Sequence, residues 1–421
     1  MHAEVIAIGD ELTSGQRLDT NSQWLSERLG ELGVRTLYHS TVGDDLAANI
    51  RVFREALDRS DIIVCTGGLG PTADDLTRQA LAETLGVGLV MDDESLAHIQ
   101  AIFARRKRDM PPRNTIQAML PAGSRAIPNP HGTAPGIDLQ LVREGRIACR
   151  LFALPGVPAE MREMWELTVG PAIQKLTGGR CVIRHHQIKC FGVGESDLEQ
   201  MLPDVIARGR LPAVGITVHQ ATISLRITAE AASEAACVES MQPTISTIRD
   251  CLGSLIFGEG NDELQHAVIQ MLRSRSQGLA TLEWGSGGLL ANWLSEVDDA
   301  SNVYRGGIVV RNAEALAVTL RDAGQDLESL DEVAMIRRMA SHVRDQFATD
   351  YALALGAFPD RETVDLAAGE LHFALATPQT VLSKAVPFTG HPDILKERAV
   401  KQALNFLRLT LLAEDTARGC R

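Results

Sequence analysis

Three pairs of neighbouring acidic residues, each just after a short apolar segment, are the residues in this sequence best suited to chemistry. The pairs are Asp10-Glu11, Asp44-Asp45 and Asp74-Asp75. If the apolar segments are parallel strands, the pairs follow their carboxyl ends and meet at one edge of the sheet, where ligands bind in such folds. Six like charges gathered there repel one another unless cations neutralise them. We therefore expect a divalent metal, most simply Mg²⁺, which takes carboxylate and phosphate oxygens as ligands.

A glycine-rich segment lies just before the third acidic pair and contains Gly67, Gly68 and Gly70. Glycines let backbone N–H groups approach an anion closely because they have no side chain. The helix expected to start near residues 75–77 would turn its positive N-terminal end toward the same place. The segment therefore predicts a phosphate-binding loop, and the residues that we expect to complete its pocket are Thr20, Asn21, Thr72 or Thr77, and the loops 132–136 and 156–158.

Several of these residues also have a purely structural interpretation. Asp19 or Thr20 is equally suited to cap a helix, and Asp44 and Asp45 could simply begin one, where negative charge is favoured. The common placement of the acidic pairs and the glycine loop favours function over these alternatives. The pair at 185–186, His-His, lies on a predicted strand, so its side chains face opposite sides and are not expected to share a metal.

The elements that must position these residues alternate between strand and helix in the first 176 residues. A buried strand is expected at 4–8, and further strands up to Val42, at 61–65 and at 146–154. The helices between them show apolar positions at helical spacing, such as Leu25, Leu29 and Leu32. A last helix runs to about residue 176. This rhythm predicts an α/β domain with a doubly wound, mostly parallel sheet.

Two further segments follow a glycine-containing linker at 177–180. Residues 181–258 predict a small α+β domain, in which Ile223, Leu225 and Ile227 alternate along a half-exposed strand. Residues 259–421 predict a second α/β domain, with strands near 279–283, 303–310, 351–355, 371–377 and 381–386 and a closing helix over 393–412.

Composition limits the functional classes. The chain has 421 residues, too many for one hydrophobic core. A net charge of −13 disfavours general binding to nucleic acid. No apolar run approaches 18 residues and no export signal is visible, so we expect no membrane span and a cytoplasmic protein. The seven cysteines include no C-x-x-C pair, which argues against disulfides and structural zinc.

The motifs of the first segment resemble those of the CinA family, the competence- and damage-inducible proteins. The stretches that carry the resemblance are 9–12 (GDEL), 14–16 (SGQ), 19–21 (DTN), 42–45 (VGDD), 66–77 (TGGLGPTADDLT), 128–136 (PNPHGTAPG) and 154–161 (LPGVPAEM). The resemblance implies a molybdopterin-binding-like first domain, a small linking domain that contains 191–196 (FGVGES), and a homodimer.

For the first domain the resemblance implies a metal-dependent ADP-ribose pyrophosphatase that releases AMP and ribose 5-phosphate. We expect Mg²⁺, or Co²⁺ or Mn²⁺ in its place, on Asp10, Asp44 and Asp75. The expected catalytic carboxylates are Asp75, Asp74, Asp44 and Glu11, with Asp74 or Glu11 as general base. The expected substrate-binding residues are Gly67, Gly68, Gly70, Thr72, Thr77, Asn21 and Gly156. Two alternatives stay open: a non-catalytic module that binds molybdopterin or a nucleotide, and transfer chemistry on molybdopterin.

The third segment departs from the family pattern, which implies a nicotinamide mononucleotide deamidase with a Glu-Ser-Cys-Thr-Gly-Gly nucleophile motif. Here residues 283–288 read Glu-Trp-Gly-Ser-Gly-Gly, so Trp284 takes the position of the serine, and an indole cannot attack an amide carbon. The family's tyrosine and lysine align with Arg311 and Leu316, and 356–360 (GAFPD) replaces a glycine-rich loop. We expect deamidase activity to be lost, with Ser286 as the only displaced hydroxyl.

Overall fold

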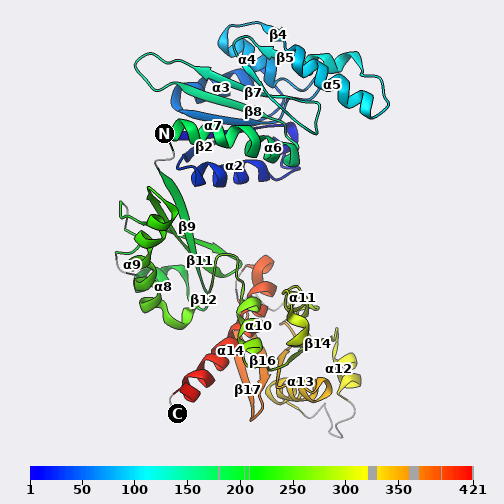
Figure 1. The fold of residues 1–421 in the computed structure, drawn as a ribbon. Helices are drawn as coiled ribbons and strands as arrows, with labels where there is room; N and C mark the ends of the chain where they lie inside the picture. Colours follow the sequence, from blue (N-terminus) through cyan, green and yellow to red (C-terminus); the bar gives the residue numbers. More distant parts are fainter. Residues whose placement is uncertain are drawn as a thin grey trace. The chain divides into compact units, whose positions relative to one another are not determined.

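A computed structural model describes residues 1–178, 181–202, 204–207, 209–320, 330–359, 369–389 and 391–419 (Figure 1). The chain divides into two compact units, Met1–Arg184 with Thr228–Met241, and His185–Ile227 with Gln242–Arg421. Among the described helices, none combines the length and the apolar character needed to cross a membrane. The predicted linker residues 179 and 180 lie outside the described part.

The first unit contains the predicted doubly wound, mostly parallel sheet, which confirms that fold class. Its strand order is β2-β1-β3-β8-β7-β6. The parallel strands are β1 (His2–Ile8), β2 (Arg35–Val42), β3 (Ile62–Thr66) and β8 (Cys149–Leu154), and β7 (Gly136–Leu141) and β6 (Arg125–Ile127) continue the sheet in antiparallel pairs. All residues of β3 are buried, as expected for a strand covered on both faces.

Helices cover both faces of this sheet because alternate strand residues face two separate cores. Ile6 and Ile8 pack with α3 (Leu46–Arg59) and α4 (Thr77–Leu85). Val5 packs instead with α2 (Thr20–Glu31), α6 (Pro158–Met164) and α7 (Gly170–Thr177), and Figure 1 shows these three helices on one side of the sheet. The helix predicted to run to residue 176 is thus two helices, joined by a π-helical turn over Trp165–Val169.

The sequence did not indicate the elements between residues 86 and 141. They are α5 (Asp93–Arg105), a 3₁₀ helix at Pro112–Ala118, the small pair β4 (Leu89–Met91) and β5 (Met119–Pro121), and the strands β6 and β7.

The starts of α2 and α3 follow the capping signals in the sequence. Asp19 and Asp45 cap these helices by accepting hydrogen bonds from the amides of Ser22 (2.9 Å) and Ala48 (2.7 Å).

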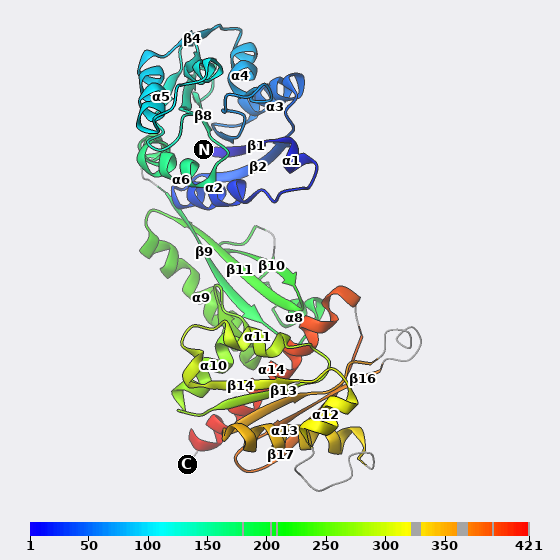
Figure 2. The same ribbon diagram turned by 90° about the vertical axis from the view of Figure 1, so that its right-hand side faces the viewer.

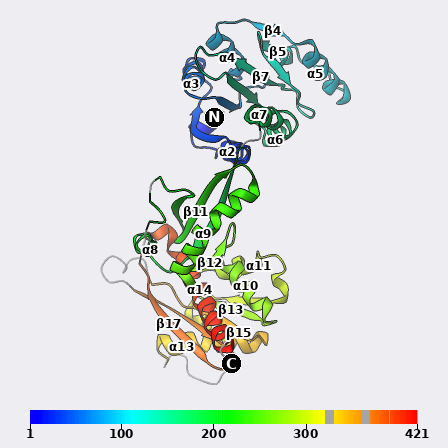
Figure 3. The same ribbon diagram turned by 60° about the vertical axis from the view of Figure 1, so that its left-hand side comes forward.

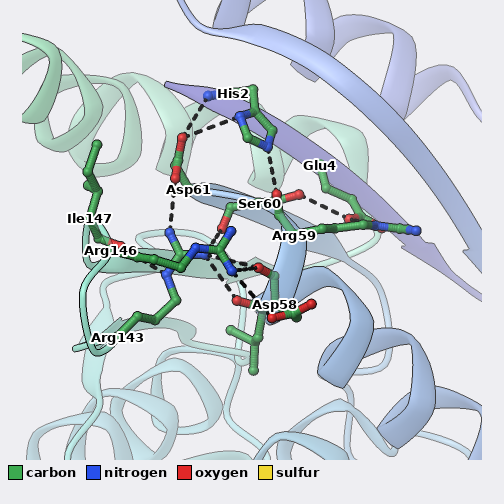
Figure 4. A network of polar contacts seen from close by, with 10 residues as sticks. His2, Glu4, Asp58, Arg59, Ser60, Asp61, Arg143, Arg146 and Ile147 are labelled. Atoms are coloured by element: carbon green, nitrogen blue, oxygen red, sulfur yellow. Dashed lines mark hydrogen bonds and ion pairs between the residues drawn. The ribbon is translucent and has the colours of Figure 1, made fainter.

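A polar network fixes the amino ends of the parallel strands, opposite the expected site (Figure 4). The fully buried Glu4 carboxylate accepts hydrogen bonds from Arg59 (2.7 and 2.9 Å) and from Ser60 (3.2 Å). Asp61 accepts a further bond from Arg143 (2.9 Å). Burial alone would raise the pKa of Glu4, but the hydrogen bonds from Arg59 and Ser40 outweigh it and lower that pKa. The carboxylate is therefore a charged structural anchor.

A sheet with strand order β10-β11-β9-β12 forms the linking domain (Figure 2). Its strands are β9 (Val182–Cys190), β10 (Ala213–His219), β11 (Thr222–Ala231) and β12 (Ile256–Glu259), and its helices are α8 (Glu195–Met201) and α9 (Glu234–Leu252). Ile223, Leu225 and Ile227 on β11 are buried, as the alternation predicted, but Thr222 and Ser224 are buried as well, so the first half of this strand is not half-exposed. The division between the two compact units passes through β9, β11 and α9.

The C-terminal sheet has the strand order β14-β13-β15-β16-β17. Strands β13, β15 and β17 of this sheet are labelled in Figure 3. Strands β14 (Tyr304–Val309), β13 (Leu279–Glu283) and β15 (Tyr351–Leu355) are parallel, and β16 (Glu370–Ala376) and β17 (Val381–Pro387) are antiparallel. One face packs on α10 (Leu264–Ser274), α11 (Leu289–Ser295) and α14 (Pro392–Gly419), and the other on α12 (Ala313–Thr319) and α13 (Glu332–Phe347).

Candidate functional site

A cavity of about 390 Å³ lies at the carboxyl edge of the first sheet, where the acidic pairs and the glycine loop were expected to meet. The loops after β1, β2, β3 and β8 all reach it. The predicted residues that line it are Glu11, Asp44, Gly67, Gly68, Gly70, Asp74, Asp75 and Gly156. Loops far apart in sequence therefore come together at one mouth of the sheet.

Asp10 and Asp44 form a reciprocal pair at this edge. The Asp10 amide donates to Asp44 Oδ2 (3.0 Å), and the Asp44 amide donates to Asp10 Oδ1 (2.9 Å). The pairing follows from strand register, because Ile8 on β1 lies opposite Val42 on β2. Within the described part of the chain, the second oxygen of each carboxylate has no hydrogen-bond partner. Each aspartate thus keeps one oxygen for a ligand, although Asp10 itself does not line the cavity.

The surroundings of Asp44 change its acidity. Burial raises the pKa of its carboxyl group, the Asp10 amide lowers it, and the nearby negative charges of Asp10, Asp74 and Glu11 raise it further. The net pKa is above the ordinary value for an aspartate. This side chain therefore lies in a concentrated negative field, which a bound cation would relieve.

The glycine loop has a backbone that other residues could not adopt. Gly67 has φ 109°, and a Cβ at that position would lie 2.2 Å from the Ile8 carbonyl oxygen. Its amide donates to the Leu154 carbonyl (3.0 Å), and the Gly70 amide donates to Asp75 (2.7 Å). The amides of Gly68 and Leu69 have no acceptor among the described residues. Of the amides predicted to bind phosphate, these two are the ones left free.

Asp75 holds the glycine loop together. One of its oxygens accepts the Gly70 amide, and the other accepts the amide (2.8 Å) and the hydroxyl (2.5 Å) of Thr72. Within the described ranges, no three acidic, histidine or cysteine side chains are grouped closely enough to hold a metal ion. The metal set Asp10, Asp44 and Asp75 stays a prediction, and the geometry pairs only the first two.

Three substrate-binding predictions, Thr77, Asn21 and Thr72, fall on residues with internal partners. Thr77 is buried and does not line the cavity, and its hydroxyl donates to the Gly67 carbonyl (2.8 Å). Asn21 donates to Gly156 (3.0 Å) and Thr66 (3.2 Å) beside a smaller adjoining cavity of about 30 Å³. Thr72 lines neither cavity. These side chains position the loops around the site.

Sequence reasoning missed Arg78, the side chain that holds the glycine loop from beneath. It is 2% exposed and donates to the carbonyls of Leu69 (2.7 Å) and Gly70 (2.5 Å). Burial lowers its pKa to about 10, so it is still charged at neutral pH. The sequence feature that could have indicated this role is the position of Arg78 in the first turn of the helix that follows the glycines.

The loop at 132–136 closes the cavity as expected, and Thr133 and Ala134 line it. The buried Asn129 fixes this loop by donating to Ala134 (2.9 Å) and Glu160 (2.7 Å).

The C-terminal domain places its displaced hydroxyl away from solvent. Ser286 is fully buried and donates to Glu283, whose carboxylate also accepts the amides of Leu290 (3.0 Å) and Ala291 (2.8 Å). Trp284 packs against the core under α13. Arg311 is exposed, Leu316 is buried, and residue 360 lies outside the described part.

Comparisons with known proteins cover nearly the whole chain. Family models described as "Probable molybdopterin binding domain", "Damage-inducible protein CinA KH domain" and "CinA C-terminal domain" match residues 4–175, 185–258 and 261–411. A putative competence-damage inducible protein of Caldicellulosiruptor bescii is 35% identical over 98% of this chain and 100% of its own length. A CinA-like protein of Frankia casuarinae is also 35% identical, over 98% of this chain and 96% of its own length.

Among solved structures, the protein CinA of Thermoplasma acidophilum is 34% identical to this chain. It covers 41% of this chain and 97% of its own, with a TM-score of 0.37. The full-length relatives and the three consecutive family models show that the chain belongs to the CinA family.

Proposed function

We propose that the N-terminal domain hydrolyses a nucleotide pyrophosphate such as ADP-ribose to AMP and ribose 5-phosphate, with a divalent cation. The observation that carries the proposal is one cavity with two kinds of group on its walls: the free amides of the glycine loop, and the carboxylates Glu11, Asp44 and Asp74. Amides of this kind donate to phosphoryl oxygens. Carboxylates are the groups that bind Mg²⁺ or accept a proton from water.

The charge of the cavity explains why a cation is needed. Its acidic lining residues are Glu11, Asp44, Asp74, Asp75 and Glu160, and Arg17 is the only cation among the described residues that line it. A diphosphate would be repelled by such walls. Mg²⁺ commonly uses one or two carboxylates and completes its shell with substrate phosphates. The free oxygen of Asp44 in the cavity fits this role, and Asp10, which is paired with Asp44 outside the lining, is the second candidate ligand. When bound, the cation supplies positive charge to the diphosphate and makes a water more acidic.

The protein's own groups have separate roles in this proposal. The amides of Gly68 and Leu69 bind the phosphoryl oxygens and stabilise the charge that grows on them. Asp74, which is exposed at the cavity, or Glu11 accepts the proton from the attacking water. Asp75 and Arg78 keep the loop in the conformation that presents the two amides.

The test is product analysis with the purified full-length chain. ADP-ribose is incubated with Mg²⁺, Mn²⁺ or Co²⁺, or with EDTA, and the products are separated by anion-exchange chromatography. We expect AMP and ribose 5-phosphate in equal amounts with a metal and neither with EDTA. ADP-ribose that stays intact under all metals would reject the proposal.

A non-catalytic binding module is the second candidate, and one observation favours it. Within the described part of the chain, the acidic side chains do not group as three metal ligands. Calorimetry that shows a saturable heat for ADP-ribose or molybdopterin with Mg²⁺, while chromatography finds no product, would support this candidate over hydrolysis.

We also propose that the C-terminal domain has no nicotinamide mononucleotide deamidase activity. Trp284 replaces the nucleophile, and the hydroxyl of Ser286 is buried and engaged with Glu283. Release of ammonia from nicotinamide mononucleotide by the purified chain would contradict this.

A further inference from the structure

The second compact unit contains a groove that the proposed reaction does not use. It has a volume of about 710 Å³, within the range of small-molecule sites. On one side is the turn 191–195, part of the FGVGES motif, and on the other are β17 and α14. We call it the 191–195 groove. The sequence alone assigns no chemical role to the FGVGES motif.

The side-chain amide of a largely buried asparagine, Asn405, opens into this groove. Asn405 on α14 is 9% exposed, and its Oδ1 accepts a hydrogen bond from Arg408 Nε (2.9 Å). Arg408 is itself fixed by the carbonyls of Ile256 (3.0 Å) and Ser254 (2.6 Å). The Nδ2 group therefore faces the turn, 3.6 Å from where a Cβ on Gly192 would lie. It has no acceptor among the described residues and is not one of the side-chain atoms closed off from solvent, so it is open to a ligand in the groove.

The turn leaves space in front of this amide. Gly192 has φ 110°, a conformation that requires glycine. Gly194 has an ordinary φ of −76°, and a Cβ there would come no closer than 3.3 Å to the flexible end of the Asp197 side chain. The backbone does not demand a glycine at 194, but a side chain there would narrow the groove.

Two cations line the groove together with this amide. Lys384 on β17 and Arg398 on α14 line it, and neither forms an ion pair within the described ranges. Phe406 and Leu409 contribute partly exposed apolar surface, and Glu195 and Asp197 contribute acceptors on the opposite side. The ligand that matches these walls has an anionic head, a flat apolar body and hydroxyl or amino donors.

A buried ionic network makes the groove preformed. Lys401 on α14 lies 3.3 Å from Glu263 and donates to Thr222 on β11 (2.7 Å). Lys189 on β9 donates to the same glutamate (2.7 Å). The two walls of the groove, from the linking domain and from α14, are thus tied together beside it.

We infer that the 191–195 groove binds a nucleoside monophosphate. The phosphate accepts from Asn405 Nδ2, Lys384 and Arg398, the base lies on the apolar wall, and the ribose hydroxyls donate to Glu195 or Asp197. The inference does not rest on the proposed hydrolysis, because no residue is shared between the groove and the N-terminal cavity.

The test is equilibrium dialysis of radiolabelled AMP against the full-length chain and its variants. Asn405→Asp keeps the oxygen that Arg408 needs but turns the group facing the ligand from a donor into an anion, so AMP should bind at least about tenfold more weakly. Lys384→Gln, on an exposed side chain that folding does not need, should weaken AMP severalfold. Lys396→Gln is the matched control, because this lysine lies on the same helix outside the groove.

Adenosine, which has no phosphate, should bind at least about tenfold more weakly than AMP. The inference is overturned if AMP shows no saturable binding below about 1 mM, or if Asn405→Asp and Lys384→Gln both bind AMP as the unmodified chain does. Hydrolysis of ADP-ribose is measured in the same preparations and should be unchanged in all three variants. A chain that binds AMP in this way but hydrolyses nothing would reject the proposed function alone.

Discussion

The surroundings of Asp44 show most directly how negative the N-terminal cavity is. Its pKa is raised by burial and by the charges of Asp10, Asp74 and Glu11. A raised pKa in the folded state means that the charged form is less stable in the folded chain than in the unfolded one. Without a cation, the charge of Asp44 therefore opposes folding at neutral pH. This penalty shrinks as the pH falls through the folded pKa and is gone only below the unfolded pKa.

We predict that Asp44→Asn raises the melting temperature of the metal-free protein by a few degrees at pH 7.5 and by much less near pH 3.5. The asparagine oxygen can still accept the Asp10 amide. Thermal unfolding in EDTA at both pH values measures this. A lower melting temperature of the variant at pH 7.5 would show that the carboxylate stabilises the fold and is not held in a repulsive field.

Replacing Asp75 by asparagine should destabilise the protein, which is the opposite of the effect expected for Asp44→Asn. Both of its oxygens accept backbone amides of its own loop, and asparagine offers only one acceptor. Asp75→Asn should therefore lower the free energy of unfolding by about 1–3 kcal/mol and also reduce hydrolysis of ADP-ribose at least tenfold. Urea unfolding and initial rates together measure both effects. Full activity in this variant would remove Asp75 from the site.

At the scale of elements, β1, β2, β3 and β8 bring the site together, and their existence could be predicted from sequence. β1, β3 and β8 are runs of apolar residues that stand out between helices, whereas β2 is mostly polar and exposed, and the sequence indicated only its end near Val42. The short strands β4 to β6 have three residues each and show no period, so the residue pattern does not indicate them. The placement of Glu11 and Asp44 followed from where strands end. The pairing of Asp10 with Asp44 depends on the register of β1 and β2, and spacing along the chain does not reveal register.

The link between the glycine loop and α4 depends on Arg78, which sequence reasoning missed because arginine is usually exposed. Arg78→Met removes both donors to the loop carbonyls and should destabilise the protein by about 1–3 kcal/mol. Hydrogen–deuterium exchange should speed up at the amides of 67–76. The control is the exposed neighbour on the same helix, Gln79→Met, which should leave exchange in this loop unchanged. Equal exchange in both variants would show that Arg78 does not hold the loop.

At the scale of the whole molecule, the two α/β domains differ at the positions where the family resemblance implies site residues: the first has the acidic pairs and the glycine loop, and the second has Trp284 in place of the expected serine. Glu283 now accepts hydrogen bonds from Ser286 and from the first turn of α11, so this segment serves the fold. We predict that Ser286→Ala lowers the melting temperature by leaving a buried carboxylate short of a donor, without changing hydrolysis of ADP-ribose. A scan of thermal unfolding and an assay for AMP measure these. Loss of a measurable ammonia-releasing activity in this variant would instead make Ser286 a nucleophile.

The most direct measurement compares two neighbouring variants in one assay. Asp44→Asn removes a cavity carboxylate, and Asp45→Asn removes an equal charge one residue away, where asparagine caps α3 as well as aspartate does. With Mg²⁺ and ADP-ribose, kcat/KM for AMP release should fall at least tenfold in Asp44→Asn and stay within about twofold of the unmodified chain in Asp45→Asn. Equal rates in the two variants would place the chemistry somewhere other than the carboxyl edge of the first sheet.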